Sequence, residues 1–160
     1  MIVIAVLAVL AAVAMPFLRD AILNQRVRTA VSDAHLSLLL ARSEAIKRNT
    51  DLNMEKTGAT WDLGWKVWVT NPDSTVSILR TRDAVADVTI ACNTDSDPTT
   101  IEACPDMVTF KRTGRSSSLI EYRIYVNGNA RVFARCVKLS VSGVPRVLID
   151  QDGDPDNGCG

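Results

Sequence analysis

Four aspartates alternate with other residues near the C-terminus, and alternating carboxylates can hold a metal ion. They are Asp150, Asp152, Asp154 and Asp156. Carboxylate oxygens are ligands that calcium prefers, so these residues are the candidate metal ligands and calcium the candidate cofactor. The spacing departs from the EF-hand loop, because Pro155 or Asn157 stands where that loop requires glycine and no bidentate glutamate follows. A solvated turn held by Cys159 is the simpler interpretation, with calcium as the alternative.

The C-terminal half also contains all the cysteines of the chain, Cys92, Cys104, Cys136 and Cys159. None belongs to a Cys-x-x-Cys pair, and His35 is the only histidine, so a zinc site is poorly supplied. An even number of cysteines behind an apolar, export-like N-terminus favours two disulfides formed in an oxidising compartment. Sequence alone allows three pairings. We expect Cys92–Cys104 and Cys136–Cys159, because each closes a local stretch rich in Asp, Asn, Pro and Gly.

A short basic turn is the candidate nucleic-acid contact. Lys111, Arg112 and Arg115 lie around Gly114, and Arg146 adds to them if the strands align. Three further cations could join the same surface: Arg131, Arg135 and Lys138. Phosphate binding depends on several such charges acting together, whereas the net charge of the chain is zero. We therefore expect a solvated surface without a nucleic-acid partner, and we keep DNA capture as the alternative.

Catalytic patterns are weak throughout the chain. His35 falls among helix-surface positions, where a lone histidine is commonly just solvated. No glycine-rich phosphate loop follows a strand, no nucleophile elbow is present, and paired carboxylates are not evident in the second part of the chain. The sequence predicts that the protein is not an enzyme.

The elements that carry these residues begin with an apolar N-terminal segment. Met1 to Leu18 include no charged or polar side chain, and as a helix they reach roughly 27 Å, close to the ~30 Å hydrocarbon core of a bilayer. A signal peptide is one interpretation, because Ala12–Ala14 resembles a cleavage site, although a basic region before it is missing. A plain membrane anchor is another, and a buried core helix is a third, although eighteen apolar residues are more than a small domain usually surrounds. We favour a helix that leaves the membrane and packs against copies of itself.

After Arg19 the apolar residues continue as a single stripe with helical spacing. Its members are Leu23, Val27, Ala30, Val31, Ala34, Leu38, Ala41 and Ala45. Charged residues such as Arg28 and Glu44 take the opposite positions. The pattern predicts one continuous helix that is wholly apolar in its first half and amphipathic in its second.

Beyond Asn49 the hydrophobic pattern alternates, as in β-strands. Strands are expected at residues 65–70, 76–79, 87–92, 107–112, 119–126, 130–141 and 144–149. Asn127–Gly128 favours a tight hairpin turn. The predicted fold class is α+β. Residues 1–49 form the long helix, with 1–18 as a membrane or filament-core segment, and its amphipathic half packs on residues 50–160, an antiparallel two-sheet β domain with a disulfide-closed C-terminal loop.

Four segments carry a resemblance to a known family. They are the apolar run Met1–Phe17 with its proline, the helix end Leu40–Asn49, the strand motif Gly64–Val69 and the strand pair Cys136–Val147. Together they resemble the type IV pilins and type II secretion pseudopilins, in the GspH/FimT-type branch. The resemblance implies the pilin fold and a structural subunit of an extracytoplasmic type IV filament, either a pilus or a pseudopilus. It also implies partners that are copies of the chain or other pilins.

The resemblance further places the chain in the inner membrane before assembly, and then in a periplasmic or extracellular filament at the cell surface. The helix residues expected in the filament core are Val3, Val6, Leu10, Val13 and Pro16. Pro16 makes a kink or a melted turn near Met15 inexpensive.

Two departures from the family pattern matter. Aligned on Pro16, the chain begins a few residues later than family members, and no glutamate stands near its start, so we assign no leader-peptidase site. Some members act as DNA-binding minor pilins in natural transformation and carry a Gly-Arg-x-Arg motif. In this chain Gly143–Arg146 retains only the second arginine of that motif.

The metal hypothesis yields a direct test. If the aspartates hold calcium, a chelator lowers the melting temperature of the protein, because a ligand stabilises only the state that binds it. Asp152→Ala then removes the difference between the two melting curves. The solvated-turn interpretation predicts one melting temperature with and without chelator, and thermal unfolding followed by circular dichroism separates the two.

Overall fold

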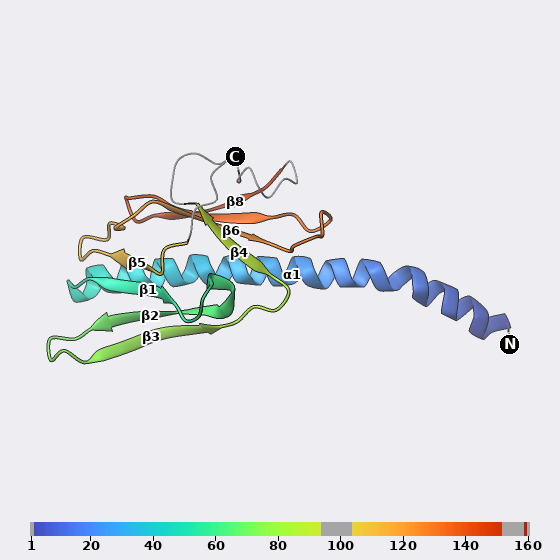
Figure 1. The fold of residues 1–160 in the computed structure, drawn as a ribbon, viewed down its shortest axis with the longest axis horizontal. Coiled ribbons are helices and arrows are strands. Elements are labelled where there is room, and N and C mark those ends of the chain that lie inside the picture. Colours follow the sequence, from blue (N-terminus) through green and yellow to red (C-terminus); the bar gives the residue numbers. More distant parts are fainter. Residues whose placement is uncertain (1, 94–103, 152–158, 160) are drawn as a thin grey trace.

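The computed structural model of the chain describes residues 2–93, 104–151 and 159, and for residues 2–16 the description covers the backbone alone. Its first element, α1 (Ile2–Arg48), is a single helix of 47 residues. The helix extends well beyond the strands towards the N-terminus (Figure 1). Met15 and Pro16 remain helical, and the helix bends towards its N-terminal end rather than unwinding there (Figure 1).

The C-terminal end of α1 is defined by its backbone. Asn49 adopts a φ of 51°, a left-handed conformation that asparagine tolerates better than most residues. The amides of Asn49 and Thr50 donate to the carbonyls of Ile46 and Ala45, at 3.3 and 3.2 Å. These bonds satisfy carbonyls that would otherwise lack partners in the last turn, so the chain reverses into the first strand.

The strands form two antiparallel sheets of four. The first has the order β3-β2-β1-β5, with β1 at Leu52–Lys56, β2 at Gly64–Thr70, β3 at Val76–Asp83 and β5 at Met107–Phe110. The second has the order β4-β6-β7-β8, with β4 at Thr89–Asn93, β6 at Ile120–Tyr125, β7 at Arg135–Leu139 and β8 at Pro145–Ile149. A short 3-10 helix, η1 (Trp61–Leu63), precedes β2. The predicted α+β class, with a long helix on a two-sheet domain, is confirmed.

Two strand predictions were wrong. β1 was missed although it occupies an interior position in its sheet, because only Leu52 and Met54 are apolar and the residues between and after them are poor strand formers. The expected tight hairpin at Asn127–Gly128 is instead a connection of nine residues between Tyr125 and Arg135, so residues 130–134 are not a strand. Gly128 does adopt the predicted positive φ, at 72°, within this longer loop.

The hydrophobic core lies where α1 passes between the two sheets (Figure 1). All the predicted stripe residues of the helix are buried, from Leu23 to Ala45. They meet apolar side chains of both sheets, which are Leu52, Met54, Trp65, Val67, Val69, Val108 and Phe110 on one side and Ile120, Tyr122, Ile124, Val137 and Leu139 on the other. Trp61 and Tyr122 make an edge-to-face contact, with ring centroids 5.0 Å apart. The second half of the helix is therefore the central element of the core.

Polar contacts fix the rotation of α1 about its own axis. The buried hydroxyl of Ser37 donates to the carbonyl of Asp33 at 2.7 Å and accepts the indole N–H of Trp65 at 2.9 Å. The carboxylate of Asp33 receives Arg80 at 3.2 Å and Arg82 at 2.7 Å, both from β3. Ser37 and Trp65 are buried and the Asp33 ion pairs are half-buried, so a rotation of α1 would leave these polar groups unpaired.

Ser37→Ala tests this anchoring. The substitution leaves the indole N–H of Trp65 without its partner in the core, which we expect to lower the free energy of unfolding by about 1–3 kcal/mol. Ser43→Ala on the exposed side of the same helix is the matched control and should change stability by no more than about 0.5 kcal/mol. Urea unfolding of the full chain in detergent, followed by tryptophan fluorescence, measures both. Equal losses in the two variants would contradict the anchoring role.

Candidate functional site

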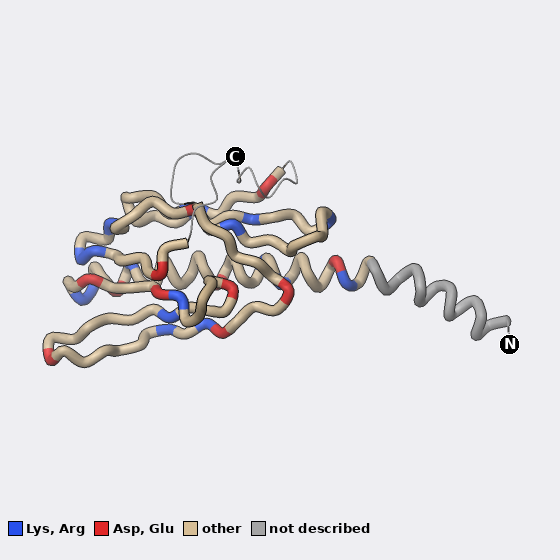
Figure 2. Tube along the Cα trace, viewed as in Figure 1, with Lys and Arg blue, Asp and Glu red and all other residues tan. Residues whose placement is uncertain are grey.

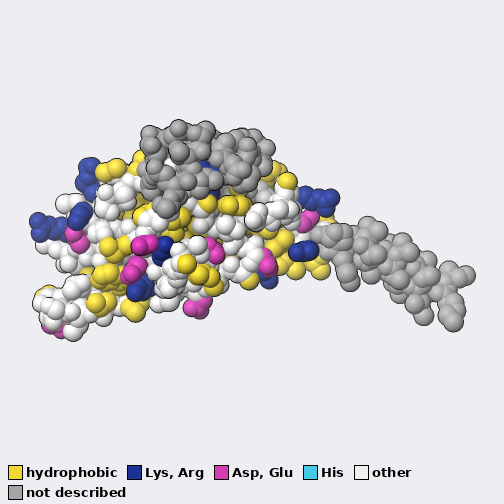
Figure 3. Space-filling view, viewed as in Figure 1, with side chains coloured by type: hydrophobic (Ala, Val, Ile, Leu, Met, Phe, Trp, Pro, Cys, Tyr) yellow, Lys and Arg dark blue, Asp and Glu magenta, His cyan; other side chains and the backbone are white. Residues whose placement is uncertain are grey.

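The residues expected in a filament core lie on the projecting part of the helix. Val3, Val6, Leu10, Val13 and Pro16 all belong to α1, and their side chains lie outside the described residues. The first described side chains are apolar and open to solvent, since Phe17 is 79% exposed and Leu18 is 62% exposed. Hydrophobic and basic side chains gather where this segment leaves the domain (Figure 3). Within the part of the chain that is fully described, no helix is both long and apolar enough to cross a membrane.

Going from the N-terminus towards the β domain, the first polar contact between α1 and the domain is made by Asp20. The Asp20 carboxylate accepts a hydrogen bond from the side-chain amide of Asn129 at 2.8 Å and an ion pair from Arg131 at 3.6 Å. Both partners come from the β6–β7 connection, and Leu23, three residues further on, is already buried. Figure 2 shows charged residues where the helix leaves the β domain. The sequence analysis did not predict this contact of Asp20 with Asn129 and Arg131, because a contact between a helix and a distant loop leaves no local pattern in the sequence.

The opposite end of the helix is held by two turns. Arg42 donates to the carbonyl of Gly114 at 3.2 Å. A Cβ built on Gly143, whose φ is 77°, would lie 1.9 Å from that same carbonyl oxygen, so only glycine allows the two turns to approach this closely. Asp20 and Arg42 are about 33 Å apart along the helix axis. The described helix is thus fastened near both ends of the β domain.

The predicted basic turn is partly neutralised. Lys111 pairs with Asp51 at 2.9 Å, and the backbone amide of Arg112 donates to the same carboxylate at 3.0 Å. The hydrogen bond from Lys111 is the main cause that lowers the pKa of Asp51 below its usual value. Arg115 and Arg146 are both exposed.

The other cations of the DNA hypothesis are divided between different contacts. Arg146 lies opposite Lys138 in the β7–β8 register, and Lys138 pairs with Glu121 at 3.3 Å. Arg131 lies with Asp20 at the far end of the domain. The geometry therefore does not bring all the predicted cations into one phosphate-binding surface.

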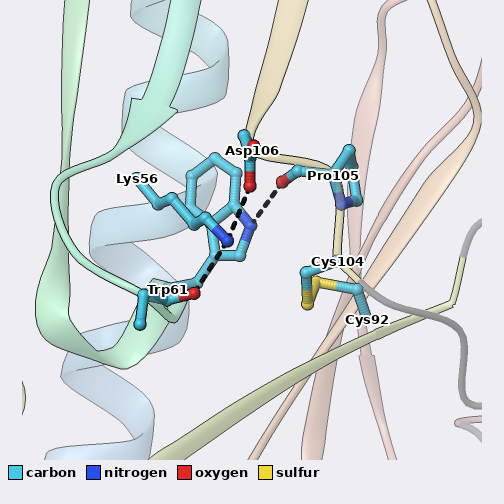
Figure 4. The surroundings of a disulfide bond; sticks show 7 residues. Lys56, Trp61, Cys92, Cys104, Pro105 and Asp106 are labelled. Carbon is cyan, nitrogen blue, oxygen red and sulfur yellow. Dashed lines mark hydrogen bonds and ion pairs between the residues drawn. A yellow bond between two sulfur atoms is a disulfide. The ribbon is translucent and has the colours of Figure 1, made fainter.

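The cysteines pair as expected, Cys92 with Cys104 and Cys136 with Cys159. The segment that follows Cys104 is tied to the first sheet (Figure 4). The indole N–H of Trp61 donates to the carbonyl of Pro105 at 3.0 Å, and Lys56 pairs with Asp106 at 2.7 Å. The first disulfide thus links β4 of one sheet to a segment anchored on the other.

The second disulfide joins Cys159 to β7. The backbone amide of Cys159 also donates to the buried carboxylate of Glu121 at 3.3 Å. Glu121, Cys136 and Cys159 are the only group of possible metal-binding residues among those described. Because both sulfurs are held in the disulfide, they offer no thiolate to a metal.

Only one of the four predicted calcium ligands is described. Asp150 is buried, and its backbone amide donates to the carbonyl of Ala134 at 3.1 Å. Asp152, Asp154 and Asp156 lie outside the described residues. Calcium binding stays a prediction.

A helix that completes the core of a two-sheet antiparallel domain with one half, and projects beyond it with the other, defines the pilin class of fold. Solved structures show the same architecture. The chain is similar to the type IV minor pilin FimU of Pseudomonas aeruginosa, with 18% identity and a TM-score of 0.63, over 84% of this chain and 96% of that one. It is also similar to the minor pseudopilin EpsH from the type 2 secretion system of Vibrio cholerae, with 13% identity and a TM-score of 0.59, over 78% and 97%. At these identities the likeness is one of fold.

The sequence comparison defines the family. The profile of type II transport protein GspH matches residues 30–144, most of the chain. The chain therefore belongs to the GspH family, as the resemblance in its segments implied. A search of curated proteins gives no match. The structures that the chain resembles are pilins, not enzymes.

The second disulfide gives a stability prediction. We expect the double variant Cys136→Ser/Cys159→Ser to lose roughly 2–4 kcal/mol of unfolding free energy, because the bridge no longer restricts the unfolded chain. Denaturant unfolding measures the loss, and non-reducing peptide mapping of the parent protein checks the pairing. A peptide that links Cys92 to Cys136 would contradict the connectivity.

Proposed function

We propose that this chain is a structural subunit of an extracytoplasmic type IV filament, either a pilus or the pseudopilus of type II secretion. Family membership supports the subunit role. The observation that carries the proposal is the division of α1. Its second half is covered by two sheets, whereas its first half projects beyond them and its sequence is wholly apolar.

The projecting, apolar half of α1 must be shielded from water. Burying one large apolar side chain contributes about 1.5–3 kcal/mol relative to leaving it in water. The β domain does not reach the segment before Asp20, and Phe17 and Leu18 are exposed in the isolated chain. Parallel copies of such a helix cover one another in a filament core, and the Ala and Val residues of the segment allow the close approach that this requires.

Before assembly, a lipid bilayer can shield the apolar segment from water. The chain therefore resides first in the inner membrane and afterwards in a periplasmic or extracellular filament. Two disulfides support a compartment outside the reducing cytoplasm. Copies of this chain or other pilins are the proposed partners. No observation on the described residues favours nucleic acid, because the cations are divided between separate contacts.

Charge placed in the apolar half tests the proposal. Val6→Arg or Ala11→Asp should abolish incorporation into filaments, since a charge in a dry helical core costs several kcal/mol. Val76→Arg, on an exposed position of β3, is the control and should incorporate normally. Immunoblots of sheared filaments against total cell protein give the measurement. Normal incorporation of Val6→Arg would contradict assembly through this segment.

A further inference from the structure

A cavity of about 330 Å³ lies between α1 and the β6–β7 connection, at the end of the domain from which the helix projects (Figure 1). Arg19, Asp20 and Leu23 line it from the helix, and residues 126–129 and Arg131 line it from the connection. We call this space the Arg19 cavity. Its charged lining residues are two arginines and one aspartate, so the lining carries a net positive charge.

The Arg19 cavity offers donors to an anion. The side chain of Arg131 is 78% exposed, and its distance of 3.6 Å from Asp20 is longer than a hydrogen bond, so the guanidinium keeps its donors for another acceptor. Arg19 is exposed, and no carboxylate among the described residues pairs with it. The backbone amides of Asn127 and Gly128 also donate to no acceptor among the described residues.

The cavity lies at the level where the apolar run of the helix ends. Arg19 is the first charged residue after that run, and Asp20, the contact of Arg131, lies only about 1.5 Å further along the axis. Where a helix enters a bilayer, arginines near the end of its apolar run lie among the lipid headgroups. Phe17 and Leu18, which directly precede the cavity, are exposed. An apolar surface therefore borders a cationic one, as the acyl chains of a phospholipid border its phosphate.

We infer that the Arg19 cavity binds the headgroup of an anionic phospholipid, with its phosphate held by Arg19 and Arg131, while the chain resides in the membrane. This inference rests on the proposed function and adds a ligand for the state before assembly. The planar guanidinium group matches the geometry of phosphate oxygens. Because one arginine belongs to the helix and the other to the β6–β7 connection, a bound headgroup contacts both and holds the β domain at a fixed height above the bilayer.

Native mass spectrometry of the full chain, released from non-ionic detergent micelles, tests the inference. Phosphatidylglycerol and phosphatidylcholine are added in equal amounts, and the ratio of the two lipid adducts is measured. We expect the parent chain to retain phosphatidylglycerol in excess, and Arg19→Gln and Arg131→Gln each to lower the ratio about fivefold. Arg115→Gln, at an exposed arginine of the distal turn, is the matched control and should leave the ratio unchanged. Circular dichroism and disulfide formation should match the parent in all three variants.

Photo-labelling gives a second measurement that needs no substitution. A phosphatidylglycerol with a diazirine in its headgroup is placed in phosphatidylcholine vesicles that contain the parent chain, and we expect it to label residues 126–131. Equal retention of the two lipids by the parent, an equal loss in Arg115→Gln, or labelling confined to the distal turn would overturn the inference.

Glycerol phosphate distinguishes a lipid from a soluble phosphate compound. It has the same phosphate chemistry without acyl chains, and we expect it not to displace phosphatidylglycerol from the parent chain. Displacement would assign the Arg19 cavity to a soluble phosphate compound and overturn the lipid assignment. If the parent chain does not enter vesicles, the proposed function fails, whereas a chain that enters them without preferring the anionic lipid contradicts only this inference.

Discussion

The structure depends on one constraint, which is that the second half of α1 must be buried between two sheets. Four alanines among its stripe residues bring the backbone close to the strands, and Leu23, Val27 and Leu38 fill the remaining space. Without the helix, the inner faces of both sheets would lose their common cover. Without the sheets, the stripe would be exposed to water. Each half of the domain therefore requires the other, and the polar contacts of Ser37 and Asp33 select a single rotation of the helix.

The same constraint explains how one helix serves two environments. Because α1 is continuous, a rigid connection runs from the apolar segment into the domain core. The contact of Asn129 and Arg131 with Asp20 marks the boundary between the projecting segment and the part of the helix in the core. No loop separates the projecting segment from the part of the helix that lies in the core. One disulfide joins Cys104 to β4, and the other joins Cys159 to β7.

Much of this was predictable from local pattern. The stripe from Leu23 to Ala45 has helical spacing, and every predicted member is buried, since a long amphipathic period is the strongest signal in a sequence. The cysteine pairing followed from local loop closure. The features that the sequence did not predict depend on partners distant in sequence. β1 has a strand environment without strand-forming residues. The nine-residue β6–β7 connection is shaped by its contact with Asp20.

The central claim is that residues 23–45 of the helix belong to the same cooperative unit as the sheets. Amide hydrogen exchange on the full chain in detergent micelles tests it most directly, because amides that open only by global unfolding share one free energy of opening. The account predicts that amides of residues 23–45 exchange as slowly as those of β1, β2, β6 and β7, with the same dependence on urea. Exchange of the helix amides well ahead of the strand amides, with a weaker dependence on urea, would contradict it.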